Sequence, residues 1–91
     1  MIRIMNISRR RCHNIAEIHN ISIGRETVCI SAVTMTGTWL RFTMSNDLGH
    51  IYELHIDDKV FTCNDILENP DRVKMEIELE HVKTMLDRIP Q

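Results

Sequence analysis

The fold follows mainly from one stretch of the sequence, residues 27–62, which reads TVCISAVTMTGTWLRFTMSNDLGHIYELHIDDKVFT. Apolar and polar side chains alternate in three runs of this stretch, 28–33, 39–44 and 51–56. Alternation with a period of two is typical of β-strands that bury one face. The stretch therefore predicts an antiparallel β-meander over about 27–62, with a short fourth strand at 59–62.

The two turns of this meander fix the pairing of its strands. Residues 35–37 and 47–49 each end in glycine, which suits three-residue hairpin loops with a left-handed last residue. Loops of this length set Phe42 opposite both Ile30 and Leu54, so that the apolar side chains of all three strands share one face. Two-residue loops would set apolar side chains against polar ones.

Residues 70–89 follow the pattern of a C-terminal helix. Asn69 suits the N-cap, Pro70 suits the first helical position, and Pro90 ends the pattern. Residues 73–79 also alternate in polarity, so a strand there, followed by a shorter helix, is the alternative. We favour the helix because apolar residues recur at helical spacing, at Met75, Leu79, Val82, Leu86 and Ile89, with Met85 beside them.

The first 26 residues fit two structures. Ile2 and Ile4 have the spacing of a strand. A helix over 8–20 would instead place Arg9–Arg11 at its N-terminus, where positive charge is unfavourable. The sequence leaves the choice between strand and helix open. The helix would bury Cys12, Ile15, Ala16 and His19.

Length and composition place these elements in one small domain spanning residues 1–91. A chain of this length supports a single core, and 43% hydrophobic with 26% charged residues is typical of globular proteins. No apolar run approaches the roughly 20 residues of a membrane span. The expected fold is α+β, with an antiparallel meander of three to four strands packed with the C-terminal helix and an N-terminal strand or helix.

No catalytic or metal-binding motif is present in the sequence. The glycines at 24, 37 and 49 are isolated, so no phosphate-binding loop occurs. The three cysteines at 12, 29 and 63 show neither disulfide nor zinc spacing. We therefore expect no catalysis, no cofactor and no metal. Polar residues follow Arg9–Arg11, which does not fit a signal peptide, and we expect a cytoplasmic protein with free thiols.

Two surfaces are candidate binding sites for another protein. The outer face of the meander carries the only tryptophan, Trp39, beside Arg41, and the predicted register sets His55 opposite Arg41. Tryptophan and arginine are enriched among interface hot spots. The second candidate is the acidic strip Glu76, Glu78 and Glu80, which suits a basic partner.

Charge is divided unevenly along the chain. Residues 1–45 carry six arginines against two glutamates, whereas residues 46–91 carry five basic and eleven acidic residues. The two halves either neutralise each other within the fold or form a basic face and an acidic face. In the second case the chain is complementary to itself, which favours a homodimer.

These observations favour a non-catalytic protein–protein interaction module. In size, lack of motifs and richness in Ile, Met and Asn, the chain is similar to small accessory proteins of phages and mobile elements. That resemblance implies an inhibitor or adaptor that binds and blocks a host protein. The alternative is a small nucleic-acid-binding regulator that uses Arg9, Arg10 and Arg11. A pI near 6.2 weighs against it.

Overall fold

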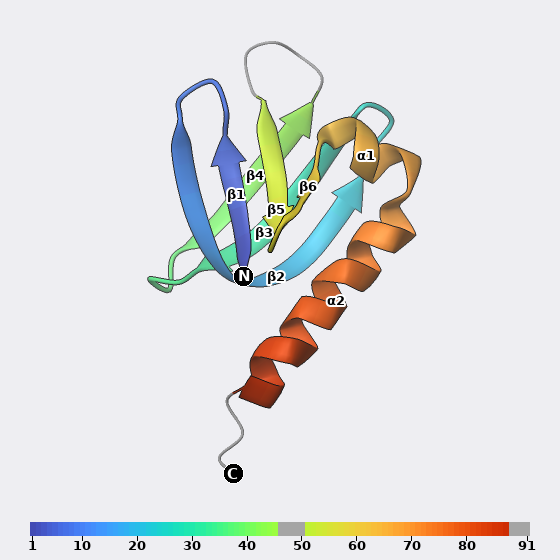
Figure 1. Ribbon diagram of the computed structural model, residues 1–91. Coiled ribbons are helices and arrows are strands. Elements are labelled where there is room, and N and C mark those ends of the chain that lie inside the picture. The colour runs from blue at the N-terminus through green and yellow to red at the C-terminus, as the bar shows by residue number, and fades with distance from the viewer. Residues whose placement is uncertain (46–50, 88–91) are drawn as a thin grey trace.

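The computed structural model describes residues 1–45 and 51–87, which form an antiparallel six-stranded sheet and two helices (Figure 1). The strand order is β4-β3-β2-β1-β5-β6. The expected α+β class, with an antiparallel sheet and a C-terminal helix, is confirmed, but the sheet has more strands than predicted. The predicted turn at 47–49 and the helix end at Ile89 and Pro90 lie outside the described residues. The elements are β1 (Ile2–Asn6), β2 (Arg11–Ile23), β3 (Thr27–Thr34), β4 (Trp39–Ser45), β5 (Tyr52–Ile56), β6 (Lys59–Phe61), α1 (Cys63–Glu68) and α2 (Pro70–Asp87).

The β3–β4 hairpin has the predicted register. Phe42 pairs with Ile30, and Arg41 pairs with Ser31. Gly37 closes the turn with a φ of 85°, and its N–H donates to the carbonyl of Thr34 at 2.9 Å. A side chain is unfavourable at that φ, so glycine is the residue that the turn requires.

The predicted pairing of β4 with β5 is wrong. β5 pairs instead with β1, with Leu54 beside Ile4 and Ile56 beside Ile2. β1 presents the same alternation as β4, and both of its isoleucines are almost fully buried. The chain therefore crosses from β4 to the far side of β1, which is a connection of the Greek-key kind.

The N-terminal segment is a pair of strands, so the predicted helix over 8–20 is wrong. β2 buries Ile15, Ile18 and Ile21 at intervals of three, a spacing that resembles a helix. The pairing of β2 with β3 shifts between Ile15 and Glu17 and again between Ile18 and Asn20. Each such bulge adds a residue that faces outward and re-phases the buried side. Three residues that the helix would have buried, Cys12, Ala16 and His19, are exposed.

Both helices begin at side-chain caps. Thr62 and Asp65 form a reciprocal capping box at α1. The side chain of Asn69 accepts a hydrogen bond from the Arg72 N–H at 3.3 Å, which confirms the predicted cap of α2. The segment 73–79 is helical, so the strand alternative is excluded.

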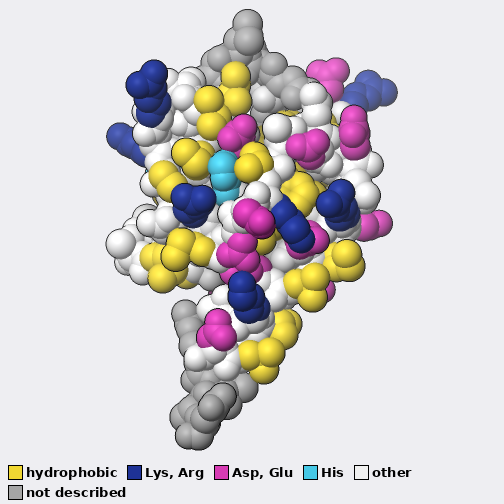
Figure 2. All heavy atoms as spheres, in the orientation of Figure 1, with side chains coloured by type: hydrophobic (Ala, Val, Ile, Leu, Met, Phe, Trp, Pro, Cys, Tyr) yellow, Lys and Arg dark blue, Asp and Glu magenta, His cyan; other side chains and the backbone are white. Residues whose placement is uncertain are grey.

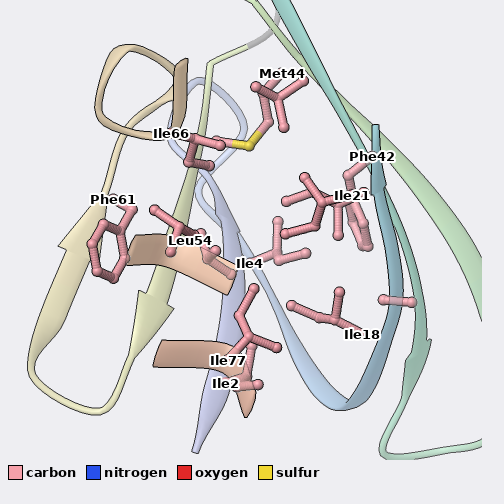
Figure 3. Close-up of a cluster of buried hydrophobic side chains, with 14 of the residues drawn as sticks. Ile2, Ile4, Ile18, Ile21, Phe42, Met44, Leu54, Phe61, Ile66 and Ile77 are labelled. Carbon is pink, nitrogen blue, oxygen red and sulfur yellow. The ribbon is translucent and has the colours of Figure 1, made fainter. Parts of the chain in front are cut away.

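The core lies between the concave side of the sheet and the two helices (Figure 3). The helices contribute Ile66 from α1 and Val73 and Ile77 from α2. The predicted apolar stripe of α2 is not among the core residues. The opposite side of the helix packs on the sheet, so the described members of the stripe are exposed: Met75, Leu79, Val82, Met85 and Leu86.

We predict that Ile4→Ala lowers the free energy of unfolding by about 2–5 kcal/mol, since the cavity forms in a central strand with neighbours on both sides. Ile23→Ala, at a partly exposed strand end, is the matched control and should cost about 1 kcal/mol or less. Urea unfolding of both variants measures the difference. Equal costs would contradict the placement of β1 inside the sheet.

Candidate functional site

Trp39 opens β4 and lies on the outer face of the sheet. Its side chain is 64% exposed. The imidazole of His19 lies against it, with ring centroids 4.3 Å apart and ring planes 33° apart. β3 runs between the strands that carry the two rings, and Val33 pairs with Trp39 across the hairpin. The bulged part of β2 places His19 on the outer face.

Arg41 lies two residues along β4 on the same face, and it is exposed. The carboxylate of Glu17 approaches His19 with an oxygen-to-nitrogen distance of 3.7 Å. We call these residues the Trp39 surface: Trp39, His19, Val33, Arg41 and Glu17. This surface combines the aromatic pair of Trp39 and His19 with one valine, one positive side chain (Arg41) and one negative side chain (Glu17).

His55 does not belong to this surface, which corrects the predicted contact with Arg41. Its strand, β5, is separated from β4 by β3, β2 and β1. His55 pairs with Arg3 and Val60, and its Nε2 lies 3.1 Å from Oε1 of Glu53. The prediction failed with the β4–β5 pairing on which it depended.

The three glutamates of α2 do not form a strip. Glu76 accepts a hydrogen bond from Lys59 Nζ at 2.8 Å, and Glu78 is exposed. Glu80 is buried and pairs with the ammonium group of Met1. Alternate residues share one face on a strand, but they lie about 200° apart on a helix. The three glutamates of the predicted acidic surface therefore lie in three different environments.

A cluster of charges ties α2 to the β5–β6 turn. The Met1 ammonium lies 2.5 Å from Oδ1 of Asp57, and Lys83 Nζ lies 3.3 Å from Oδ2. The hydrogen bond from the ammonium, followed by that from Lys83, lowers the pKa of Asp57 to about 2. Asp57 has a φ of 54°, a left-handed conformation that aspartate adopts more readily than most residues.

A second contact joins α2 to β2 at a bulge. The backbone N–H of Ile18 donates to Nε2 of His81 at 3.4 Å. Ile18 pairs with Ala32 next to the second register shift of β2, and the helix supplies an acceptor for its N–H. The contact fixes the rotation of α2 about its axis.

Arg9, Arg10 and Arg11 lie at the turn between β1 and β2 and are all exposed. The buried side chain of Asn6 accepts hydrogen bonds from Ser8 Oγ at 2.9 Å and from the Arg9 N–H at 3.0 Å. Arg10 has a φ of 52°. The turn therefore presents three guanidinium groups from an ordered hairpin tip.

The remaining chemistry of the described residues is sparse. Cys12 is exposed and Cys63 is buried, and burial raises the pKa of the Cys63 thiol. Within residues 1–45 and 51–87, no three acidic, His or Cys side chains converge as metal ligands would. None of the helices in that part of the chain combines the length and apolar character needed to span a membrane.

Two surface features were not predicted from the sequence: the position of His19 and the outward direction of the apolar side of α2. Local pattern identified Trp39 and Arg41 but not His19, because helical spacing disguised the bulged strand that carries His19. It identified the apolar spacing of α2 but not the outward direction of the stripe. The second feature had a signal in the sequence, since Val73 and Ile77 define another apolar side of the same helix.

Comparisons with family models, curated proteins and solved structures found no match to this chain.

We predict that Asp57→Asn lowers the melting temperature at pH 7 but not at pH 2. The pKa of Asp57 is lowered in the folded chain, so its ion pairs stabilise the fold above about pH 4 and are lost as the pH falls toward 2. Asparagine tolerates the left-handed φ and removes only the charge. Thermal melts of both proteins across this range test the prediction. A difference that does not change with pH would contradict it.

Proposed function

We propose that this chain is a non-catalytic protein–protein interaction module that binds an acidic protein partner through the Trp39 surface. The observation that carries the proposal is the exposed indole of Trp39, held against His19 with Arg41 on the same strand. Tryptophan and arginine dominate the binding energy of many interfaces, and each needs a partner pocket or partner charge to do so.

The geometry of Trp39 favours binding because its ring is already supported. Association costs free energy when flexible side chains become ordered at the interface. Contact with the imidazole and the strand restricts the indole before a partner arrives. Because the ring stays more than half exposed, a partner gains most of its apolar area.

The charge distribution supports an acidic partner. Both helices pack on the inner face of the sheet, where α1 contacts β3 and α2 contacts β2, whereas the Trp39 surface lies on the outer face. Residues 1–45, which form β1 to β4, carry the net positive charge, and residues 51–87, which include both helices, carry the net negative charge. The Trp39 surface belongs to the positively charged part of the chain and faces away from the acidic helices, which favours the approach of an acidic surface.

A cytoplasmic inhibitor or adaptor of the phage or mobile-element accessory type fits this proposal. Such a protein acts by covering a surface of its target and needs no reaction centre. The cysteines are free and one of them is exposed, which is typical of proteins in a reducing compartment. The partner-binding residues we assign are Trp39 and Arg41, with His19 as the support of the indole.

The second candidate function is nucleic-acid binding at the β1–β2 turn. It is favoured by the grouping of Arg9, Arg10 and Arg11 at one exposed tip. Guanidinium groups bind phosphates in pairs of hydrogen bonds. The overall charge of −2 opposes the approach of a polyanion, so we place this function second.

We predict that the double substitution Trp39→Ala, Arg41→Ala abolishes capture of a stoichiometric acidic protein from nuclease-treated lysate of the native cells. The loss follows from removal of both anchors of the interface. Mass spectrometry of the eluates identifies the partner, and circular dichroism verifies that the variant is folded. The matched control is Val60→Ala, Arg25→Ala, which removes an exposed apolar and an exposed basic residue elsewhere. Equal capture by wild type and double variant would contradict the assigned surface.

We predict that labelled single- and double-stranded oligonucleotides bind this chain only weakly, with no loss on changing the arginine turn. The variant is Arg9→Gln, Arg10→Asn, Arg11→Gln, in which asparagine suits the left-handed φ of residue 10. Fluorescence anisotropy at low and high salt makes the measurement. Tight binding that falls steeply with salt and disappears in the variant would make nucleic-acid binding the function.

A further inference from the structure

β4 is an edge strand, with β3 on one side and none of the described strands on the other. Its seven residues, WLRFTMS, pair with β3 in one unbroken register. An edge strand leaves half of its backbone N–H and C=O groups without a partner in the sheet. The positions of these groups determine what the edge can bind.

The hairpin turn shows which residues of β4 direct their backbone groups to the open edge. The N–H of Thr34 donates to the carbonyl of Thr38 at 2.9 Å, so these two residues form a hydrogen-bonded pair. Along an antiparallel ladder, such pairs alternate with pairs that are not hydrogen-bonded. From Thr38 onward, every second residue is therefore bonded to β3: Leu40, Phe42 and Met44. The residues between them point their backbone groups away from β3, and we call them the outward residues: Trp39, Arg41 and Thr43.

The outward residues form a regular row of binding groups. Each is exposed, and none of residues 1–45 and 51–87 is hydrogen-bonded to their backbone N–H and C=O groups. The row repeats about every 7 Å, which is twice the rise of one strand residue. A second extended backbone offers matching groups at the same interval, as it does when a peptide adds to a sheet edge. The edge is therefore complementary to another β-strand.

The opposite edge of the sheet is protected against such pairing, whereas β4 is not. β6 has only three residues, begins with Lys59 and contacts α1. Short edge strands, lysine and a covering helix are devices that keep an edge from pairing with other chains. β4 is longer and contains no lysine, proline or glycine. The fold thus closes one edge and leaves the other open.

The charges near the two edges favour an acidic strand at β4. Arg41 is the middle outward residue, and its side chain lies on the outer face. A strand residue directly opposite Arg41 has its own side chain on the same face, about 5 Å away, where a carboxylate forms a charge pair. On the side of the molecule that Figure 2 shows, acidic side chains gather over the helices, which repels an acidic segment from that side.

We infer that the open edge of β4 binds an extended acidic segment of the protein partner, which adds to the six-stranded sheet as a further strand. The backbone of the segment bonds to the outward residues, and one of its carboxylates pairs with Arg41. The indole of Trp39 packs on a neighbouring side chain of the segment. This inference rests on the proposed function and names the form in which the partner reaches the Trp39 surface.

A second copy of this chain suits the edge less well than an acidic segment does. Two antiparallel copies of β4 must pair outward residues with outward residues. Every such register that overlaps most of the strand places the two copies of Arg41 directly opposite or diagonal to each other. Like charges in those positions oppose the pairing of strands.

The test is amide hydrogen exchange of the full chain, followed residue by residue by NMR, with a synthetic probe. The probe is a capped nonapeptide in which valine and glutamate alternate. In the free chain, the amides of the outward residues should exchange faster than those bonded to β3. At about ten times its dissociation constant, the peptide should slow exchange of the outward amides about tenfold. No added protection at peptide concentrations up to about 1 mM overturns the inference.

Two control peptides separate the backbone from the charge. N-methylation of the glutamates removes the donors that face β4 and keeps every carboxylate, so binding should be lost. Replacement of the glutamates by lysine keeps the backbone and sets like charge against Arg41, so binding should weaken at least several-fold. Equal binding of the N-methylated peptide would overturn the strand pairing, and equal binding of the lysine peptide would overturn the acidic preference.

A substitution in β4 tests the same contact from the side of the protein. Thr43→Pro removes one outward N–H and leaves the ladder to β3 in place, because edge strands accept proline where the N–H faces solvent. It should weaken peptide binding at least several-fold. The matched control, Thr43→Val, keeps the N–H and a branched side chain and should bind as the wild type does. Circular dichroism verifies that both variants are folded, and equal binding by a folded Thr43→Pro chain contradicts the inference.

The mass of the free chain excludes or establishes the second copy as occupant. Sedimentation equilibrium at the concentration of the NMR sample should give 10.7 kDa. Twice this mass, together with outward amides that are protected before peptide is added, would assign the edge to a second copy. That outcome overturns the inference.

Failure of this inference and failure of the proposed function are visible separately. If Trp39→Ala, Arg41→Ala abolishes capture of the acidic partner and Thr43→Pro leaves it intact, the partner binds through side chains alone and only the strand pairing is wrong. If the peptide protects the outward amides but the wild-type chain captures no acidic protein, only the proposed function is wrong.

Discussion

The structure depends on the burial of β1 between β2 and β5. Ile2 and Ile4 have paired strands on both sides and helix side chains over them, so they are the centre of the core. This placement separates β4 from β5, so that Trp39 and Arg41 share the outer face of the hairpin without His55. It also brings the β5–β6 turn to the end of β1, where Asp57 meets the Met1 ammonium and Lys83. The docking of α2 follows from that arrangement.

Local pattern was sufficient to predict the β3–β4 hairpin and the start of α2. Turn chemistry and alternation agree in the first, and Asn69 and Pro70 mark the second. Pairing across longer distances was not available from local pattern. β1 and β4 offer β5 the same alternation, and nothing in 51–56 distinguishes between them. The bulges of β2 also hid its strand periodicity of two, because this bulged strand buries every third residue, as one side of a helix does.

The candidate site residues were predicted correctly where they depend on local pattern and wrongly where they depend on long-range pairing or on helix geometry. Trp39 and Arg41 depend only on the confirmed hairpin, and they share the predicted face. His55 depended on a long-range pairing, and Glu76, Glu78 and Glu80 depended on a shared face that a helix does not provide. α2 carries two apolar sides, and its sequence alone does not say which one the sheet takes. The acceptor that His81 offers to β2 is one contact that decides the matter.

The Greek-key crossing also sets the order in which the sheet is completed. β1 is an inner strand, yet its second neighbour, β5, follows three other strands in the chain. Until residues 52–56 arrive, the isoleucine-rich edge of β1 has open hydrogen-bonding groups and can pair with the wrong strand. Closing so long a loop is slow compared with forming the hairpins. The pairing of β5 with β1 is therefore the long-range contact that completes the sheet, and it covers an edge that the β1–β4 hairpins alone would leave open.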